Sequence, residues 1–433
     1  MRYAPPGLCL NDFDIINLDD LYHVFHLQAS PTYPFDATKL ETSYGHAVSR
    51  DLIFWETKDT IFWISDPPHF DDGALWTMHI VSHSNRLWMF YTGLNQRIYF
   101  QQQIGLAYSD RTDGTDWIRY SENPIVSADP KWYQTEGDMA WRDPFVVYDE
   151  EHQRWIMYIA AKHNNGPMET RGCIGLALSD DLIHWEVQPS ILAPRQFGEM
   201  ECPVIYHINN AYYMFVSVSN FNRIYSYCAP DLMGPFEFLG VLTQPYDYAP
   251  RIVITPKNES LLIHTVKCRW SNTDLGEIVR GLLAQPKRLQ FDELRSPYLS
   301  WYSTIESYLE STSVVEANNG LFSLSIPPES RQVNARLRVI EENSEQKGLE
   351  VIMDQDYILL QYLEDKQALQ RELVNNYGAI QNIKVLLFRE YIEIYLNNRL
   401  IISTMAYRHQ KGRFEAWADG KPINFSFYPF KTF

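Results

Sequence analysis

The chain has 433 residues and carries 37 Lys and Arg against 54 Asp and Glu, which gives a formal net charge of −17. A surface this acidic repels phosphate backbones and anionic lipid, so nucleic acids and membranes are excluded as partners. Hydrophobic residues make up 45% of the chain and aromatic residues 14%. These side chains supply a large core and favour strands, and flat aromatic rings also suit carbohydrate sites.

The amino-terminal residues contain no apolar run of signal-peptide length. No segment approaches the ~18 consecutive apolar residues of a membrane-spanning helix. The cysteines are odd in number and scattered, with no C-x-x-C pair. We therefore expect a cytoplasmic protein with reduced cysteines, and neither a disulfide framework nor a zinc site.

A repeated unit organises the first 295 residues. Each copy has an aromatic strand, then in its clearest forms a Gly-x-Ala strand, Ser-x-Asp and a Trp; the copies fall at 22–55, 87–117, 154–185, 212–232 and 261–283. A unit of about 50–70 residues with several strands suits a four-stranded propeller blade. A generic β-sandwich is the alternative, but Ser-x-Asp-Leu-x-x-Trp occurs in the same register at Ser49 and Ser179. We predict an all-β, five-bladed β-propeller over residues 1–297.

The blade repeat ends after this region, and the sequence pattern changes. Residues 298–316 are polar and are predicted to form a linker with a short connecting helix. Apolar strand patterns resume and include 383–388 and 391–396, followed by a turn at Asn397-Asn398. We predict that residues 317–433 form a C-terminal β-sandwich.

Three acidic residues occupy equivalent places in successive blades. Asp12, Asp143 and Glu201 each precede the aromatic strand of their blade by ten or eleven residues. Because the innermost strands of a propeller surround one axis, these carboxylates are expected to converge. Asp14 and Glu199 are rivals, since strand alternation places each on the same face as its neighbour. Asn11 before Asp12 and Cys-Pro after Glu201 favour the first set.

These motifs together resemble glycoside hydrolase family 32, the β-fructosidases, which include invertases, levanases and inulinases. The resemblance covers nearly the whole chain in order. It rests on Asn11-Asp12, Trp76-Thr77, Arg142-Asp143-Pro144, Glu201-Cys202-Pro203, segment 44–52 (the family's Trp-Gly-His-Ala-x-Ser-x-Asp-Leu) and segment 247–250 (its Phe-Tyr-Ala-Pro).

The resemblance implies a retaining glycoside hydrolase that cleaves β-fructosidic bonds in sucrose or in levan- and inulin-type fructo-oligosaccharides. It implies Asp12 as the nucleophile and Glu201 as the acid/base, with Asp143 holding sugar hydroxyls and stabilising the transition state. No cofactor and no metal are expected. The substrate-binding residues that it implies are Asn11, Gln28, Trp76, Thr77, Arg142 and Tyr248.

The sequence departs from the family at three points. Residues 11–15 read Asn-Asp-Phe-Asp-Ile in place of Asn-Asp-Pro-Asn-Gly, and Trp76-Thr77-Met78 replaces Phe-Ser-Gly. The family's Phe-Tyr-Gln appears as Phe-His-Leu-Gln at 25–28, which displaces Gln28 by one position. All three changes fall where the family holds its terminal fructose, so the sequence indicates a divergent branch.

Two other functions compete with this one. An arabinanase- or xylosidase-like propeller normally works by inversion, with carboxyl groups ~6.5–9.5 Å apart rather than the ~5–5.5 Å of a retaining enzyme. The other is a non-catalytic carbohydrate-binding propeller. The altered opening motif is compatible with it, but the presence of all three acids argues against it.

Overall fold

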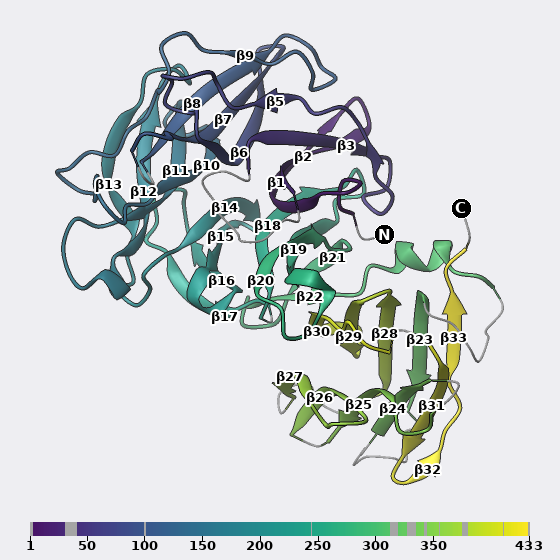
Figure 1. Cartoon of the computed structure of the whole chain (residues 1–433). Helices are drawn as coiled ribbons and strands as arrows, with labels where there is room; N and C mark the ends of the chain where they lie inside the picture. The colour runs from purple at the N-terminus through teal and green to yellow at the C-terminus, as the bar shows by residue number, and fades with distance from the viewer. Residues whose placement is uncertain are drawn as a thin grey trace. The chain divides into compact units, whose positions relative to one another are not determined.

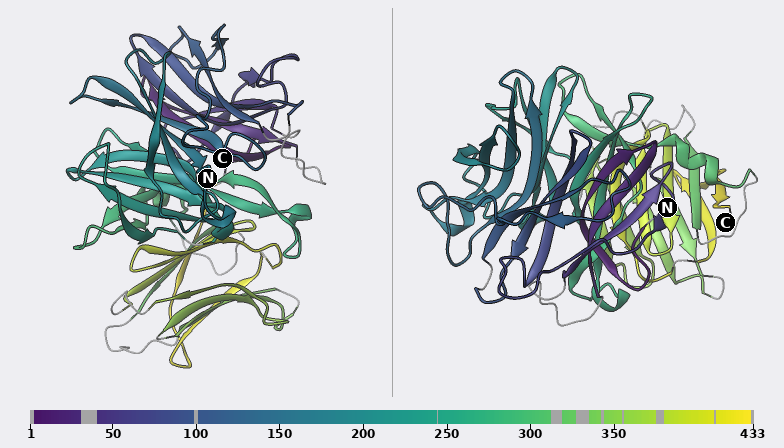
Figure 2. Two further views of the ribbon diagram at one scale, coloured as in Figure 1. Left: turned by 90° about the vertical axis from the view of Figure 1, so that its left-hand side faces the viewer. Right: turned by 90° about the horizontal axis from the view of Figure 1, so that it is seen from above.

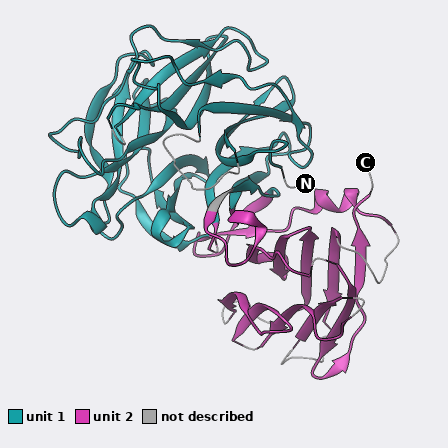
Figure 3. Ribbon diagram, viewed as in Figure 1, with its two compact units in different colours: residues 1–242, 247–267, 279–286 teal, residues 243–246, 268–278, 287–433 magenta. Residues whose placement is uncertain are grey.

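The computed structural model divides into two compact units. Unit 1 comprises residues 1–242, 247–267 and 279–286, and unit 2 comprises 243–246, 268–278 and 287–433 (Figure 3). The structure describes residues 3–30, 41–98, 101–243, 245–311, 319–326, 335–341, 344–354, 356–374, 380–409 and 411–431. Among these residues no helix has the length and apolar character that a membrane span requires.

Unit 1 contains five consecutive groups of antiparallel strands, which are the propeller blades (Figures 1 and 2). The first has β1 (Cys9–Leu18), β2 (Leu21–Ala29), β3 (Ser43–Ser49), β4 (Glu56–Thr57) and β5 (Phe62–Trp63). The second has β6 (Ala74–His83), β7 (Arg86–Leu94), β8 (Gln102–Ser109) and β9 (Ile118–Arg119). The third has β10 (Trp141–Asp149), β11 (Arg154–Lys162), β12 (Gly172–Ser179) and β13 (Glu186–Leu192).

The fourth blade has β14 (Glu201–Ile208), β15 (Ala211–Val218), β16 (Arg223–Ala229) and β17 (Glu237–Val241). The fifth includes β18 (Asp247–Ile254), β19 (Ser260–Arg269) and β20 (Ile278–Leu283). The first strand of each blade contacts the first strand of the next, and β18 contacts β1, so these five strands form a closed ring. The predicted five-bladed propeller is confirmed.

The repeated Ser-x-Asp segment is a turn with a structural role. The Ser49 hydroxyl accepts the backbone N–H groups of Asp51 and Leu52, and the Asp51 carboxylate accepts the next two. Ser179 and Asp181 repeat this pattern in the third blade. The repeat recurs because the same side chains satisfy the same turn.

Each ring strand carries a β-bulge at a matching place. The register shifts lie between Leu10 and Phe13, Trp76 and Met78, Arg142 and Phe145, Glu201 and Val204, and Tyr248 and Arg251. Asp143, Cys202 and Ala249 have left-handed φ values of 57°, 49° and 48° within these bulges. A bulge bends the strand and turns a side chain away from its regular direction.

Unit 2 is a β-sandwich, as predicted. One sheet has the order β33-β23-β28-β29-β30-β22-β21, and the other β27-β26-β25-β24-β31-β32. Their facing apolar side chains, which include Phe322 and Phe414, form one core. The predicted strand pair is β28 (Asn382–Phe388) and β29 (Tyr391–Leu396), and Asn397 and Asn398 have the left-handed φ values of a tight turn.

The remaining strands of unit 2 are β21 (Lys287–Phe291), β22 (Pro297–Ser300), β23 (Asn319–Ser325), β24 (Ala335–Ile340), β25 (Gly348–Met353), β26 (Tyr357–Tyr362), β27 (Ala368–Leu373), β30 (Arg399–Met405), β31 (Arg413–Ala418), β32 (Lys421–Pro422) and β33 (Ser426–Pro429). Short 3-10 helices span Met168–Thr170, Ser219–Phe221, Trp270–Asn272 and Ser303–Tyr308. The domain limits predicted at 297 and 316 stay a proposal, and residues 312–318 lie outside the described residues.

A buried ion pair joins three of the ring strands. The Arg251 Nε atom of β18 lies 2.9 Å from the Asp14 Oδ1 atom of β1, and both side chains are buried. Asp14 also accepts the N–H of Ile80, and Arg251 donates to the carbonyl of Met78, both on β6. Asp14 is thus a structural residue at the centre of the ring.

We predict that Asp14→Ala lowers the free energy of unfolding by about 3–5 kcal/mol, because it leaves the Arg251 charge buried and unpaired. Urea denaturation followed by tryptophan fluorescence measures this. Asp110→Ala is the matched control, since it breaks an exposed pair with Arg86 that is worth about 0–1 kcal/mol. Equal losses in the two variants would contradict the prediction.

Candidate active site

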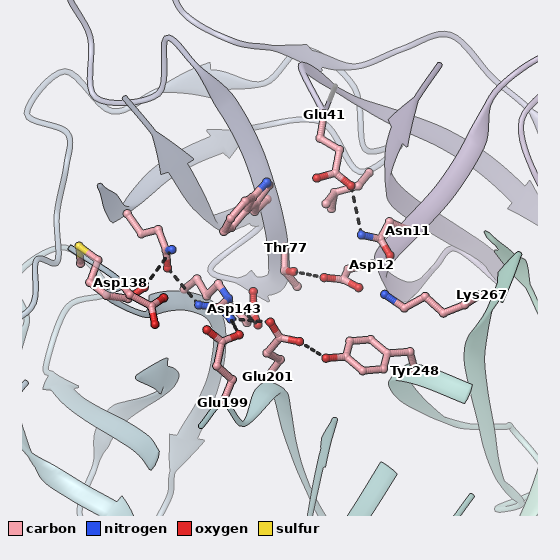
Figure 4. A pocket seen from close by; sticks show the side chains of 15 residues that line it. Asn11, Asp12, Glu41, Thr77, Asp138, Asp143, Glu199, Glu201, Tyr248 and Lys267 are labelled. Atoms are coloured by element: carbon pink, nitrogen blue, oxygen red, sulfur yellow. Dashed lines mark hydrogen bonds and ion pairs between the residues drawn. The ribbon is translucent and has the colours of Figure 1, made fainter. Parts of the chain in front are cut away.

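A cavity of about 300 Å³ lies in unit 1, where the bulged ends of the ring strands meet (Figure 4). It is lined by Asn11, Asp12, Leu27, Glu41, Trp76, Thr77, Gln102, Asp138, Met139, Arg142, Asp143, Glu199, Glu201, Tyr248 and Lys267. Every predicted site residue except Gln28 is in this set. The cavity therefore brings together residues that lie up to 256 positions apart in the sequence, from Asn11 to Lys267.

Gln28 is the exception: it is not among the residues that line the cavity, and its role in substrate binding stays a prediction. Its amide nitrogen donates to the hydroxyls of Ser43 and Thr60 at 3.0 and 2.9 Å. Neighbouring residues of a strand point to opposite faces, and on β2 it is Leu27 that lines the cavity. The one-residue displacement seen in the sequence therefore puts an apolar side chain where the family motif has an amide.

Asp12 lines the cavity with one carboxylate oxygen held by a hydrogen bond and the other unpartnered. Thr77 donates its hydroxyl to Asp12 Oδ2 at 2.5 Å. Asp12 Oδ1 is buried and has no hydrogen-bond partner among the described residues. Its rival Asp14 is engaged by Arg251 and does not line the cavity. Of the two acids, Asp12 is the one placed to act on a ligand.

Arg142 is the central cation of the site. Its Nη2 atom donates to Glu199 Oε2 at 2.8 Å and also to Glu201 Oε1. Its Nη1 atom donates to Gln102 Oε1 at 3.3 Å, and its guanidinium lies 5.8 Å from the ring centroid of Trp76. One buried guanidinium thus orients both glutamates at once.

The two glutamates are held in opposite protonation states. Burial raises the pKa of Glu201 to about 8, and the charges of Glu199 and Asp143 add to this rise while Arg142 opposes it. Burial also acts on Glu199, but Arg142 and Lys162 outweigh it and hold that pKa at about 2. The Lys162 ammonium lies 2.7 Å from Glu199 Oε1. At neutral pH Glu201 is therefore protonated and Glu199 is ionised, which favours Glu201 as the acid.

Tyr248 and Asp143 bond to β14 at Glu201 and at Cys202, respectively. The Tyr248 hydroxyl donates to Glu201 Oε2. Asp143 Oδ2 accepts the backbone N–H of Cys202 at 2.9 Å, and burial raises the pKa of Asp143. The bulges of β10 and β14 are therefore tied together next to Glu201.

Asp12, Asp143 and Cys202 could in principle hold a metal ion, because one ligand atom from each lies within 4.8 Å of the others. The donor set fits poorly. Burial raises the pKa of the Cys202 thiol well above its usual range, whereas a metal ligand must be a thiolate. The Asp143 oxygen near the thiol is already engaged by the Cys202 amide. The expectation that the site needs no metal or cofactor stays a prediction.

Several lining residues were missed by sequence reasoning. Glu41 is only 2% exposed and accepts a bond of 3.1 Å from the Asn11 amide. Gln102 accepts from the Trp141 backbone, and Lys267 comes from β19. The two signals that the sequence carries for this site are acids at equivalent positions of the blades and the family motifs. These residues lie in other strands and loops, so neither signal could find them.

We predict that Glu199→Gln lowers the pKa of Glu201. The change removes a nearby negative charge and leaves Arg142 and Lys162 with fewer acids to neutralise, and both effects favour the ionised form of Glu201. Titration of ¹³C-labelled glutamate by NMR measures the pKa, and Glu201→Gln identifies the resonance. An unchanged or higher pKa would show that Glu199 does not set this protonation state.

The chain matches the model of the glycosyl hydrolases family 32 N-terminal domain over residues 3–234, more than half its length. It is 29% identical over 225 residues to a levanase of Bacillus sp. (strain L7) and 28% identical over 220 residues to an invertase of Schizosaccharomyces pombe. These matches cover 48% and 47% of this chain but only 21% and 34% of the relatives. The chain thus spans about a fifth to a third of the length of these relatives.

The fold has close counterparts among solved structures. Fructan 1-exohydrolase IIa from Cichorium intybus superposes with a TM-score of 0.76 at 16% identity, covering 99% of this chain and 96% of that one. The Bombyx mori β-fructofuranosidase BmSUC1 gives 0.75 at 16% identity, covering 99% and 93%. At this identity the likeness speaks for the fold, a propeller followed by a sandwich. On the family match, the chain belongs to glycosyl hydrolases family 32.

Proposed function

We propose that this protein is a retaining glycoside hydrolase that cleaves β-fructosidic bonds, with sucrose or levan- and inulin-type fructo-oligosaccharides as substrates. The observation that carries the proposal is the pairing, among the residues that line one cavity, of an unpartnered carboxylate oxygen with a protonated carboxyl group. Asp12 Oδ1 supplies the first and Glu201 the second. A double displacement needs these two groups.

In the proposed mechanism, Asp12 attacks the anomeric carbon while Glu201 protonates the departing oxygen. The resulting glycosyl-enzyme is then hydrolysed by water, and Glu201, now ionised, takes the proton of that water. Arg142 and Tyr248 hold the Glu201 carboxyl in place throughout. Asp143 and Glu199 add negative charge beside a transition state that resembles an oxocarbenium ion.

The relatives support this class of substrate. Matched proteins are named levanase and invertase, and one matched structure is titled as a Bombyx mori β-fructofuranosidase mutant in complex with sucrose. A small carbohydrate is the proposed ligand of the cavity in this chain. The cytoplasmic location expected from the sequence is likewise a proposal.

We predict that Glu201→Gln lowers kcat/KM on sucrose by about 10²–10⁴-fold, because the amide cannot donate a proton to the leaving oxygen. The exposed residue Glu237 provides the control, and Glu237→Gln should leave the rate unchanged. Released fructose is measured by enzymatic assay. Unchanged turnover in Glu201→Gln would favour the non-catalytic, sugar-binding alternative.

The stereochemistry of the product tests the role of Asp12. A covalent intermediate on Asp12 predicts that the first fructose released keeps the anomeric configuration of the substrate. Proton NMR of the first turnovers, recorded before mutarotation, measures it on sucrose, levan and inulin. Inverted product would assign the protein to the arabinanase- or xylosidase-like mechanism, and absence of release from every fructoside would overturn the proposed substrate class.

A further inference from the structure

Glu41 is a buried acid of the cavity that the proposed mechanism does not use. It lies two residues before β3, is only 2% exposed and lines the cavity together with Asn11 and Asp12. The Asn11 Nδ2 atom lies 3.1 Å from Glu41 Oε1, and Figure 4 shows this bond near Asp12. Because Asn11 directly precedes Asp12, the bond holds a side chain next to the proposed nucleophile.

The chemistry of the two groups fixes the direction of this bond. An ionised carboxylate only accepts hydrogen bonds, so the Asn11 amide must turn its NH₂ group toward Glu41. The amide is planar, and its oxygen then points away from the carboxylate. In this orientation Asn11 Oδ1 is buried and has no hydrogen-bond partner among the described residues. An unsatisfied buried acceptor is unfavourable, and a ligand group that donates to it removes this penalty.

Two side chains near Asn11 carry hydrogen-bond donors, and neither donates to its oxygen. The hydroxyl of Thr77 donates to Asp12 Oδ2. The Lys267 ammonium lies 4.3 Å from the ring centroid of Tyr248 and makes no bond with Asn11 Oδ1. A sugar hydroxyl bound in the cavity supplies a donor of the kind that this oxygen lacks.

The place of Asn11 indicates which part of the substrate carries that hydroxyl. In the proposed reaction Asp12 attacks the anomeric carbon, and the leaving group departs toward Glu201. Figure 4 shows Asn11 and Glu41 on the side of Asp12 that faces away from Glu201. These two side chains therefore border the glycone rather than the leaving group.

We propose that Glu41 is a positioning residue that sets the specificity for the glycone. By accepting the NH₂ group of Asn11, it makes the Asn11 oxygen the end of the amide that meets the sugar, and the site then requires a hydroxyl donor at that place. Asn11 contacts the substrate, and Glu41 acts through it. The inference rests on the proposed function and goes beyond it, because an Asn-Asp pair alone does not determine which end of the amide faces the sugar.

The test compares sucrose with four analogues in which fluorine replaces the hydroxyl at C1, C3, C4 or C6 of the fructosyl unit. Fluorine is close to a hydroxyl in size but cannot donate a hydrogen bond. For each analogue the measured quantity is the ratio of kcat/KM for sucrose to kcat/KM for the analogue. The inductive effect of fluorine on the reaction is common to all enzyme variants, so it cancels when this ratio is compared between variants.

Three variants separate the roles of the side chains. Glu41→Gln keeps the shape of the side chain but both donates and accepts, so it no longer fixes the Asn11 amide. Asn11→Ala removes the acceptor itself. Asp138→Asn is the matched control, because it also replaces a carboxylate of the cavity lining by an amide, at a residue that pairs with Lys162 instead of Asn11.

We expect one fluorinated position at which the wild-type ratio is high, because the analogue leaves the Asn11 oxygen unsatisfied. At that position the ratio should fall by about 5- to 100-fold in Asn11→Ala, the range for an unsatisfied buried acceptor. In Glu41→Gln it should fall by at least about 3-fold, since the amide can then turn. The ratios at the other positions, and all four ratios in Asp138→Asn, should stay within about 2-fold of the wild type.

Two kinetic results would overturn the inference. One is a set of ratios that neither Glu41→Gln nor Asn11→Ala changes. The other is a ratio that falls in Asn11→Ala but not in Glu41→Gln, which would show that Asn11 binds the glycone without being oriented by Glu41.

Calorimetric binding to Glu201→Gln separates this inference from the proposed function, because it needs neither turnover nor a change at Asn11 or Glu41. Sucrose should bind more tightly than the analogue fluorinated at the position that the kinetics identify. If sucrose binds but no fructoside is cleaved by the wild type, the proposed function fails and the binding series still decides the inference. Equal affinity for sucrose and all four analogues, or no binding of any of them, contradicts the inference.

Discussion

The bulge repeated in each of the five ring strands is the constraint on which the site depends. A regular strand would continue its alternation and send the residue after Asn11, Trp76 or Arg142 to the opposite face, whereas both members of each pair line the cavity. The bulge breaks the alternation, bends the strand and turns consecutive side chains toward one cavity. In three of the five strands a proline follows at once, as in Asp143-Pro144, where the lack of an N–H costs nothing because the ladder is already interrupted.

The bulges bring the acids close together, and the balance of charge around each acid then sets its protonation state. Buried carboxylates this close cannot all ionise, so some must be neutralised and others protonated. Arg142 and Lys162 together stabilise the ionised Glu199, whereas Glu201 shares only Arg142 and stays protonated. The difference between two glutamates two residues apart thus comes from the burial of Glu201 on one side and from Lys162 of β11 beside Glu199 on the other.

These interactions explain what the sequence could and could not predict. The blade repeat was predictable because the same Ser and Asp side chains form the same turn in different blades. The spacing of Asp12, Asp143 and Glu201 from their aromatic strands was predictable because each acid lies on the first strand of its blade, and these strands form the ring. Gln28 was assigned by motif, whereas in the structure Leu27 of β2 lines the cavity and the Gln28 amide donates to Ser43 and Thr60. Glu41 and Lys267 lie beside no motif, because their place depends on which chain segments the ring brings together.

The departures from the family motif change which hydrogen-bonding groups one wall of the cavity offers to a ligand. At Leu27 the cavity has lost an amide that could both donate and accept hydrogen bonds, and at Glu41 it has a buried carboxylate that, when ionised, only accepts them. Asn11, bonded to Glu41 through its amide nitrogen, is left with a buried, unpartnered oxygen. This wall therefore offers mainly acceptors and calls for a glycone rich in hydroxyl donors.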